Sequence, residues 1–472
     1  MSISKSSTFA FSLGREMKLS LAELFALFGE WAYEAHTDEI AIFTLGYSDD
    51  EIARIFRSIG GSIRVMRVLG ETDEKRFPTD VIREITDAHS RHSEARRIQI
   101  SQSLDPSQTQ DDEPVRSNKA TFSLGSYGGE YRLSDIGLRV KKTLQDSGIS
   151  ARLVNTVNEN IVSAVWKRER LGRSKSEYNL VHMHDRDLLA VTIACQDIDA
   201  YTKRDTGKAR DMEVGMMPPK LCQMMINLAL QGSMQSAGSS NRNSNWKNEN
   251  TIHSDHWSPR TAHSIYDPFC GLGTMLIEAA NMGITKIMGS DMAPRMVDST
   301  KHSIEEFVKE EQMWQERIRA VWGTPAKDFS DFSYDIFVQD ASKIASLDRD
   351  KMSNTNIVTE WYLGEIMEKH SISIDRVKQE KAKLRNMYEW FFGGLEGLDF
   401  SGNIVMTFPF WDIHGTTSYF TEIYDVIGRH GFDIVPLLPV DTMRTLMTSK
   451  GSLLYKRPGQ QVGREVVKIR KR

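Results

Sequence analysis

The fold of this chain is decided by the stretch YDPFCGLGT, which occupies Tyr266–Thr274. It follows a short apolar run and leads into MLIEAA, residues 275–280, which has the composition of a buried helix. Gly271 and Gly273 let the backbone turn sharply and approach a ligand closely, because they have no Cβ. The helix behind them directs free N–H groups at that ligand. The stretch therefore predicts a strand, a tight turn and a helix that bind a nucleotide-type cofactor.

A second acidic residue supports this site. Asp291 ends a strand-like run eighteen residues past Gly273, where α/β nucleotide folds hold ribose hydroxyls. The dinucleotide fingerprint requires a third glycine three residues after the second, and Leu276 stands there. A nicotinamide cofactor therefore loses support. Two interpretations of the motif remain: a site for another adenosine cofactor, or a glycine turn in some other α/β protein.

The composition predicts a globular chain of two or three domains, since 472 residues exceed one ordinary core. Hydrophobic residues make up 40% and charged residues 26%, and no apolar run approaches the ~20 residues of a membrane helix. The start of the chain lacks a secretion signal. We therefore expect a cytoplasmic protein with no membrane contact. Three scattered cysteines fit a reducing compartment and argue against a cysteine-based zinc site.

Charge is unevenly spread along the chain, whose formal net charge is −4. Between Lys119 and Arg210 there are 16 Lys and Arg against 11 Asp and Glu. This excess fits a module that binds a nucleic-acid backbone, or alternatively a solvated face.

The first half of the chain predicts two small α/β units. Residues 1–100 form the first, in which Ser20 is expected to cap a helix; residues 101–118, almost without aliphatic side chains, are a linker. Residues 119–195 form the second, and 231–263 are a flexible Ser/Asn-rich insertion. Expected strands are 9–13, 40–43, 63–69, 120–124, 162–166 and 188–193, and expected helices are 20–28, 49–59 and 134–147, the last carrying Arg139, Lys141 and Lys142.

Residues 264–472 alternate regularly between strands and helices, which predicts a doubly wound, mostly parallel sheet. Ligands of such sheets lie at the carboxyl ends of the strands. Four acidic residues fall at expected strand ends, namely Asp267, Asp291, Asp340 and Glu360. Expected strands are 265–266, 287–288, 336–338, 357–359 and 404–407, and expected helices are 274–282, 295–312 and 375–392.

The sequence at 267–274 resembles the first motif of S-adenosylmethionine (SAM) dependent methyltransferases, in the variant that methylates exocyclic amines of RNA or DNA bases. SAM is then the implied cofactor. Asp267 would meet its ammonium group, Asp291 its ribose, and Asp340 its adenine amino group, unless Asp340 only caps a helix. The full set of expected cofactor residues is Asp267, Phe269, Gly271, Gly273, Thr274, Asp291, Met292, Asp340 and Ala341.

The fourth strand is followed by Glu360-Trp361-Tyr362-Leu363-Gly364. Amine methyltransferases carry an acid or amide, two prolines and an aromatic residue at this place. An exocyclic base amine is a poor nucleophile, so it needs acceptors that hold its hydrogens and an aromatic face that stacks the base. We expect Glu360 to be the acceptor and Tyr362 or Trp361 the stacking platform, with only one aromatic facing the base.

Most of the chain resembles the THUMP-domain tRNA guanine-N2 methyltransferases. The resemblance rests on three parts of the sequence: the LGRE and LSLAEL runs at 13–24, the 119–195 module, and the connecting segment 196–230, which contains MPPKL at 217–221. The resemblance implies a Rossmann-like methyltransferase domain behind ferredoxin-like and THUMP-like modules, with tRNA as substrate and a possible small activator subunit.

The fourth motif departs from the family pattern Asp-Pro-Pro-Tyr-Gly, because Glu360–Gly364 has no proline to fix the turn. Two other functions therefore stay open. One is a non-catalytic RNA-binding protein on a methyltransferase fold, and the other is a DNA adenine-amine methyltransferase.

Two further features are weaker. His182-Met183-His184-Asp185 could bind a metal, but a structural role is more common, and no metal is expected. The basic C-terminal residues 468–472 either add affinity for phosphate or are solvated.

Overall fold

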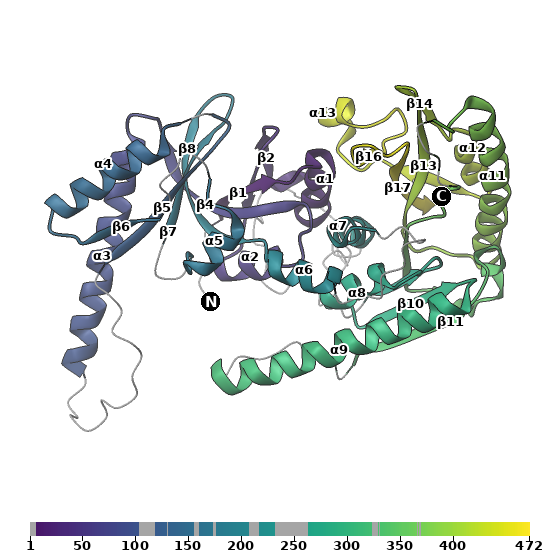
Figure 1. Cartoon of the computed structure of the whole chain (residues 1–472), viewed down its shortest axis with the longest axis horizontal. Coiled ribbons are helices and arrows are strands. Elements are labelled where there is room, and N and C mark those ends of the chain that lie inside the picture. Colours follow the sequence, from purple (N-terminus) through teal and green to yellow (C-terminus); the bar gives the residue numbers. More distant parts are fainter. Residues whose placement is uncertain are drawn as a thin grey trace, which may run out of the picture. The chain divides into compact units, whose positions relative to one another are not determined.

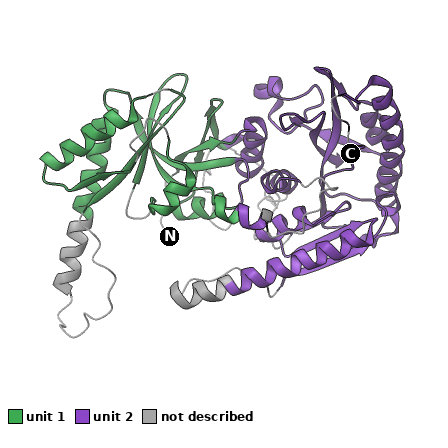
Figure 2. Cartoon of the chain, viewed as in Figure 1, with its two compact units in different colours: residues 1–14, 32–57, 62–200 green, residues 15–31, 58–61, 201–472 purple. Residues whose placement is uncertain are grey.

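The computed structural model divides the chain into two compact units (Figure 2). Unit 1 comprises residues 1–14, 32–57 and 62–200, and unit 2 comprises 15–31, 58–61 and 201–472. The structure describes residues 6–102, 119–129, 131–154, 160–172, 176–206, 217–231, 263–322, 329, 331–365, 367 and 370–472. Nearly all of the expected linker 101–118 and insertion 231–263 lies outside these residues.

Within the described residues, unit 1 is built on one eight-stranded sheet. The long strand β4 pairs with β1 on one side and with β8 on the other, both antiparallel. The two modules expected at 1–100 and 119–195 therefore share a single sheet. In spatial order its strands are β2 (Tyr33–His36), β3 (Ile40–Leu45), β1 (Ser7–Leu13), β4 (Ser62–Thr72), β8 (Asp187–Cys195), β7 (Ser176–His182), β5 (Ala120–Tyr127) and β6 (Ala151–Leu153).

Helix α4 (Leu133–Asp146) shows how unit 1 forms its core. Its apolar residues recur at helical spacing, and Ile136, Val140 and Leu144 are buried in one cluster with β5 and β7 side chains. Its polar face carries the exposed side chains of Arg139 and Lys142. The other helices of the unit are α2 (Asp49–Phe56), α3 (Phe77–Gln102) and α5 (Ser163–Arg168). Helix α6 (Ile198–Thr206) begins at the end of unit 1, and its residues from Tyr201 on belong to unit 2.

One expected strand of unit 1 is wrong. The run at 162–166 contains two β-branched valines, yet residues 163–166 lie in α5 and Val162 is its N-cap. The backbone N–H groups of Val165 and Trp166 donate to the carbonyl of Val162. These local hydrogen bonds satisfy the backbone groups that a β-strand would pair with a neighbouring strand. The β-propensity of the valines is therefore overridden by the local context.

The expected cap of the first helix is also misplaced. Helix α1 begins at Met17, three residues before Ser20 (α1, Met17–Phe28). The Ser20 hydroxyl donates instead to the carbonyls of Glu16 and Gly61, at 3.0 and 2.7 Å. The residues before it, Met-Lys-Leu, are good helix formers and extend the helix upstream.

A buried carboxylate joins α1 to the rest of unit 2. Glu23 is fully buried and accepts hydrogen bonds from the N–H groups of Gly60 and Gly61 at 2.9 and 2.7 Å. It also accepts from Asn227 Nδ2 at 2.6 Å, on helix α7 (Pro219–Leu230). Neutral donors thus satisfy this charge, which explains why α1 belongs to unit 2.

The described residues of unit 2 form a nine-stranded sheet (Figure 1). The pairs β10–β11, β9–β10, β9–β12 and β12–β13 are parallel, and β17 runs antiparallel to β13 and β15. Strand order is β11 (Ser333–Val338), β10 (Lys286–Asp291), β9 (Ser264–Asp267), β12 (Thr355–Thr359), β13 (Ile404–Ile413), β17 (Val462–Lys471) and β15 (Phe432–Val435), with β14 (Thr416–Tyr419) on β13 and β16 (Leu453–Tyr455) on β17.

This order confirms the doubly wound, Rossmann-like sheet expected for the C-terminal half. Strands β10 and β11 are added on one side of β9, and β12 and β13 on its other side. The strand order therefore switches between β9 and β12, and ligands of such sheets bind at that switch point. The helices of the unit, besides α1 and α7, are α8 (Thr274–Asn281), α9 (Pro294–Trp322), α10 (Arg349–Met352), α11 (Ile374–Gly397), α12 (Glu422–Arg429) and α13 (Val440–Met443), with 3₁₀ helices at Glu30–Ala32, Ala341–Ser346 and Arg444–Leu446.

The basic C-terminal residues are not a free tail. Lys468 lies in β17, is 3% exposed, and donates to Gln231 Oε1 at 3.0 Å. Burial lowers its pKa to about 7. Lys471 pairs with Asp399, and Arg472 pairs with Asp433. These cations are engaged within unit 2 because β17 (Val462–Lys471) pairs with β13 and β15 in its sheet.

Two absences concern the described residues alone. Every helix there is too short or too polar to span a bilayer. Those residues also hold no group of three metal-ligating side chains. His182 pairs with Asp187 at the β7–β8 turn.

Candidate cofactor and substrate site

The turn from β9 into α8 has the backbone that its glycines predict. Gly271 and Gly273 have φ angles of +52° and +82°, in the left-handed region that favours glycine. A Cβ on Gly273 would also lie 3.0 Å from Thr300 Cγ2. The hydroxyl of Thr300 donates to the carbonyl of Gly271 at 2.7 Å. The loop is therefore held against α9, and Thr274 begins α8 directly behind it.

Asp267 lies at the carboxyl end of β9 and is only 4% exposed. Its carboxylate accepts from Thr359 Oγ1 at 2.6 Å and from the Phe269 N–H at 3.1 Å. Burial raises the pKa of Asp267 to about 7, although these hydrogen bonds oppose the shift. The negative charges of Asp291 and Glu360 raise this pKa further. The charges of the two acids at the ends of β10 and β12 thus act on Asp267 at the end of β9.

Asp291 ends β10 and holds the glycine loop. One carboxylate oxygen accepts from the Gly271 N–H at 3.1 Å and the other from the Ala293 N–H at 2.9 Å. Each oxygen retains a further lone pair for a ligand. The neighbouring Met292 side chain is 74% exposed, which leaves it free to cover a ring.

Asp340 and Ala341 follow β11. The Asp340 side chain is exposed and accepts from the Ser342 N–H at 2.9 Å, so it caps the 3₁₀ helix Ala341–Ser346. This is the capping alternative that the sequence leaves open. Ala341 is 6% exposed. A contact of either residue with adenine stays a prediction.

The segment after β12 separates its two aromatic residues. Trp361 is 1% exposed and stacks on Tyr388, with ring centroids 4.3 Å apart. Phe269, from the glycine loop, packs on the same indole at 4.5 Å. Tyr362 is 46% exposed. Trp361 is therefore wrong as a stacking platform, because the core already covers its ring, and Tyr362 is the aromatic that can meet a base.

Glu360 forms an ion pair that the sequence does not suggest. Its carboxylate accepts from Nε of Arg464, on β17, and only 7% of Arg464 is exposed. Burial raises the pKa of Glu360, while Arg464 and Arg457 oppose that shift. Arg464 is 104 residues away along the chain, so no local pattern could have revealed it. Thr359, whose hydroxyl donates to Asp267, directly precedes Glu360, so its position at the strand end could have identified it from the sequence as a residue of the site.

The residues at this sheet edge fit SAM. Asp267 and Asp291 form no ion pair with a Lys, Arg or His of the described residues, so both carboxylates can serve a cationic, hydroxyl-bearing ligand. Asp267 would hold the ammonium group, Asp291 the ribose diol, and the glycine loop would let the backbone approach. Such a site needs carboxylates, backbone donors and an apolar slot.

Residues 257–370 match the family described as RMKL-like, methyltransferase domain. This part of the chain is a methyltransferase domain. A curated relative, the tRNA (guanine(10)-N2)-dimethyltransferase of Methanothermobacter thermautotrophicus, is 24% identical over 178 residues. That match covers 38% of this chain and 44% of the relative, so the chain spans less than half of the curated protein that it matches.

Two solved structures resemble the whole chain weakly. TrmN from Thermus thermophilus aligns with a TM-score of 0.43 at 12% identity, over 98% of this chain and 100% of that one. A possible methylase from Clostridium difficile 630 aligns with a TM-score of 0.42 at 14% identity, over 98% of each. The family match and the curated relative support the resemblance to guanine-N2 methyltransferases and SAM as cofactor. They do not test the THUMP-like module.

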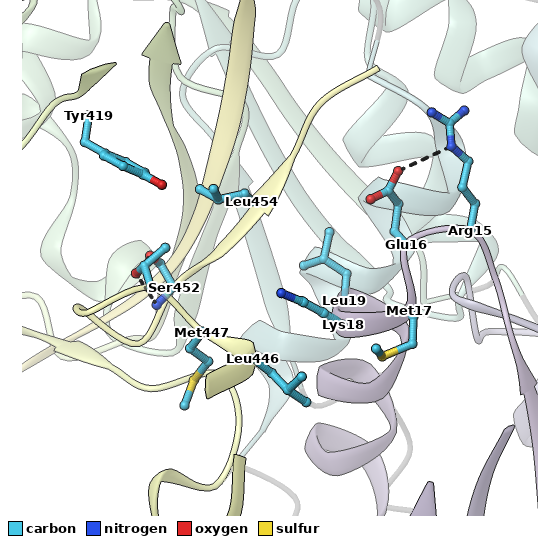
Figure 3. Close-up of a pocket in the computed structure, with 11 residues that line it drawn as sticks. Arg15, Glu16, Met17, Lys18, Leu19, Tyr419, Leu446, Met447, Ser452 and Leu454 are labelled. Atoms are coloured by element: carbon cyan, nitrogen blue, oxygen red, sulfur yellow. Dashed lines mark hydrogen bonds and ion pairs between the residues drawn. The ribbon is translucent and has the colours of Figure 1, made fainter. Parts of the chain in front are cut away.

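A separate hollow of about 430 Å³ lies elsewhere in unit 2 (Figure 3). It lies between the start of α1 and the β16 region, and Arg15 and Glu16 pair at its rim. None of the acids of the methyltransferase site lines it. Because it lacks their chemistry, we place the cofactor at the strand ends.

We expect Asp291→Ala to weaken SAM binding by about 1–3 kcal/mol, because two ribose hydroxyls lose their acceptor. Isothermal titration calorimetry measures the change. Asp348→Ala is the matched control, since Asp348, like Asp291, accepts from the backbone N–H two residues further along the chain, but it is exposed and lies outside the predicted site. Equal SAM affinity in the two variants would contradict the assignment of Asp291.

SAM affinity should rise with pH through about 7, the pKa of Asp267. Below that pH the carboxyl is protonated and cannot hold an ammonium group, so affinity should fall by up to ~10-fold per pH unit. Because the pKa of Asp267 is raised in the folded state, its ionisation lowers the free energy of unfolding of the ligand-free protein. A bound cation offsets that loss. Calorimetry between pH 6 and 8 tests this. Asp267→Asn should bind weakly at every pH and lose this dependence.

Proposed function

We propose that this chain is a SAM-dependent RNA methyltransferase that modifies the exocyclic amine of a guanosine in tRNA. The observation that carries the proposal is the meeting of Asp267, Asp291 and Glu360 at the switch point of a methyltransferase domain. The curated relative that matches part of the chain is named for methylation of guanine N2 in tRNA, which supports this substrate. With tRNA as substrate, we expect the reaction to occur in the cytoplasm.

The chain's residues would prepare the amine for transfer. SAM, when bound, supplies a methyl group to the amine lone pair, so that a nitrogen–carbon bond forms, the carbon–sulfur pair stays on sulfur as S-adenosylhomocysteine, and one amine proton is released. Glu360 would accept a hydrogen bond from the amine and hold its nitrogen in line. Tyr362 would stack on the extruded base.

The RNA platform in this proposal is the outer face of α4 in unit 1. Arg139 and Lys142 are exposed there and Lys141 is half-buried, while the opposite face of the helix packs in the core. None of the three forms an ion pair with an acidic residue in the described part of the chain. They are thus available to phosphates, which supply most of the affinity for nucleic acids.

Two other functions have to be distinguished. A non-catalytic RNA-binding protein is favoured by the missing prolines of the fourth motif. A DNA adenine-amine methyltransferase is disfavoured, since the front half of the chain resembles an RNA binder. The test is methyl transfer from labelled SAM to tRNA from a strain lacking the protein, followed by mass analysis of the nucleosides.

Methylguanosine as product supports the proposal. Methyl transfer only to DNA, or SAM binding without transfer to either substrate, contradicts it. The assay is repeated with an extract of the deletion strain, because activity that appears only then identifies a required activator subunit.

We expect Glu360→Gln to leave SAM affinity unchanged and to reduce methyl transfer on the order of 10²-fold, because the amine loses an ionised acceptor near the transition state. Steady-state kinetics and calorimetry measure the two quantities. An equal loss of SAM affinity would instead indicate a cofactor role for Glu360.

Tyr362→Ala should raise KM for tRNA by an amount that corresponds to about 1–3 kcal/mol of stacking. Trp361→Ala should lower thermal stability instead, since it removes a buried ring. Tyr334→Ala, on β11, is the control for loss of an exposed tyrosine, which is 38% exposed. A normal KM in the Tyr362 variant would place the base elsewhere.

Replacing Arg139, Lys141 and Lys142 together by Gln should make tRNA binding less sensitive to salt, by about one unit of slope for each phosphate that the protein no longer neutralises. Filter binding from about 50 to about 200 mM salt gives the slope. A full slope in the triple variant would place the RNA on another face. The control removes three exposed cations from other parts of unit 1, namely Arg54, Arg57 and Lys75.

A further inference from the structure

We propose that Arg464 is a positioning residue, which holds Glu360 as an ionised acceptor and takes over the restraint that prolines provide in related fourth motifs. The inference rests on the proposed function, because it concerns the same site. Its starting point is the ion pair between Arg464 Nε and the Glu360 carboxylate, which joins β17 to the segment after β12.

The segment after β12 needs such a restraint. No proline occurs in Glu360–Gly364, so its backbone dihedral angles are not fixed by a ring. On one side Trp361 anchors the segment in the aromatic core. Gly364, with φ of +89°, closes it against the buried Glu380. Glu360 precedes both anchors, directly after β12, and its side chain is oriented by its ion pair with Arg464.

Arg464 is itself held rigidly. It lies in the interior of β17, opposite Pro409 on β13 and Tyr455 on β16. The ring of Phe410 packs closely on the preceding Gly463, where a Cβ would lie 2.1 Å from Phe410 Cζ. The guanidinium lies 5.9 Å from the centroid of the Tyr455 ring. Figure 1 shows β13, β16 and β17 together in this part of the sheet.

The charges around Glu360 give the ion pair its chemical effect. Burial favours the neutral carboxyl of Glu360, whereas Arg464 and the exposed Arg457 favour the carboxylate. Without Arg464, the pKa of Glu360 would rise further. A protonated Glu360 would offer an O–H donor toward the amine in place of an acceptor, and its orientation would no longer be fixed.

The test compares methyl transfer by wild type, R464Q and R464K from pH 6 to 9.5. At pH 7, R464Q should lose on the order of 10-fold in kcat with SAM affinity unchanged, and it should recover activity at higher pH than wild type. The sign follows from the acid, since a higher pKa needs a higher pH for ionisation. R464K keeps the charge but not the fork of donors, so it should restore the wild-type pH dependence and part of the activity.

The variant E360Q/R464Q separates positioning from stability. It removes both charges, so no unpaired ion is left buried, and it should be no less active than E360Q. Any pH dependence that survives in E360Q belongs to other groups, Asp267 among them. R470Q is the matched control, because Arg470 is an exposed arginine near the other end of β17, and it should behave as wild type.

Four outcomes overturn the inference. The first two concern R464Q: an unchanged pH profile, or a gain of activity, which would mean that the ion pair blocks Glu360. The third is an additive loss of activity in E360Q/R464Q. The fourth is a wild-type protein that transfers no methyl group. Only the last also defeats the proposed function. If R464Q does not fold, R464K and the comparison of E360Q with E360Q/R464Q still decide.

Discussion

The buried carboxylate of Asp267 is the constraint on which the functional edge of the methyltransferase domain depends. A carboxylate taken out of water must be compensated by hydrogen bonds or by an opposite charge. Thr359 and the Phe269 N–H supply the hydrogen bonds, and in doing so they connect β9, β12 and the glycine loop. The described residues supply no cation. The site is therefore arranged around a charge that a cationic ligand can complete.

Preorganisation extends from Asp267 to the neighbouring strand. Asp291 accepts two backbone hydrogen bonds, and Thr300 fixes the carbonyl of Gly271. These contacts hold the loop in a left-handed conformation that bulkier residues would strain. The same carboxylate that we assign to the ribose thus also holds the loop.

The fourth motif shows how a departure from a family pattern can be compensated by distant parts of the chain. The aromatic core takes in Trp361 and leaves Tyr362 exposed, so the segment leaves β12 with one ring buried and the next ring at the surface. Arg464 then approaches Glu360 from β17. A missing local restraint does not by itself show that activity has been lost, because restraint can come from packing and an ion pair.

The sequence by itself determined the class of the C-terminal fold and the chemistry of its cofactor turn. Both depend on local patterns, namely the glycines at Gly271 and Gly273 and the alternation of apolar runs, which act over a few residues. Tertiary structure alone decided that one sheet unites the two N-terminal modules, that residues 163–166 are helical, and that Lys468 and Lys471 of β17 are engaged within unit 2. It also selected Tyr362 over Trp361 and brought Arg464 to Glu360, because burial and long-range ion pairs depend on which segments the fold places together.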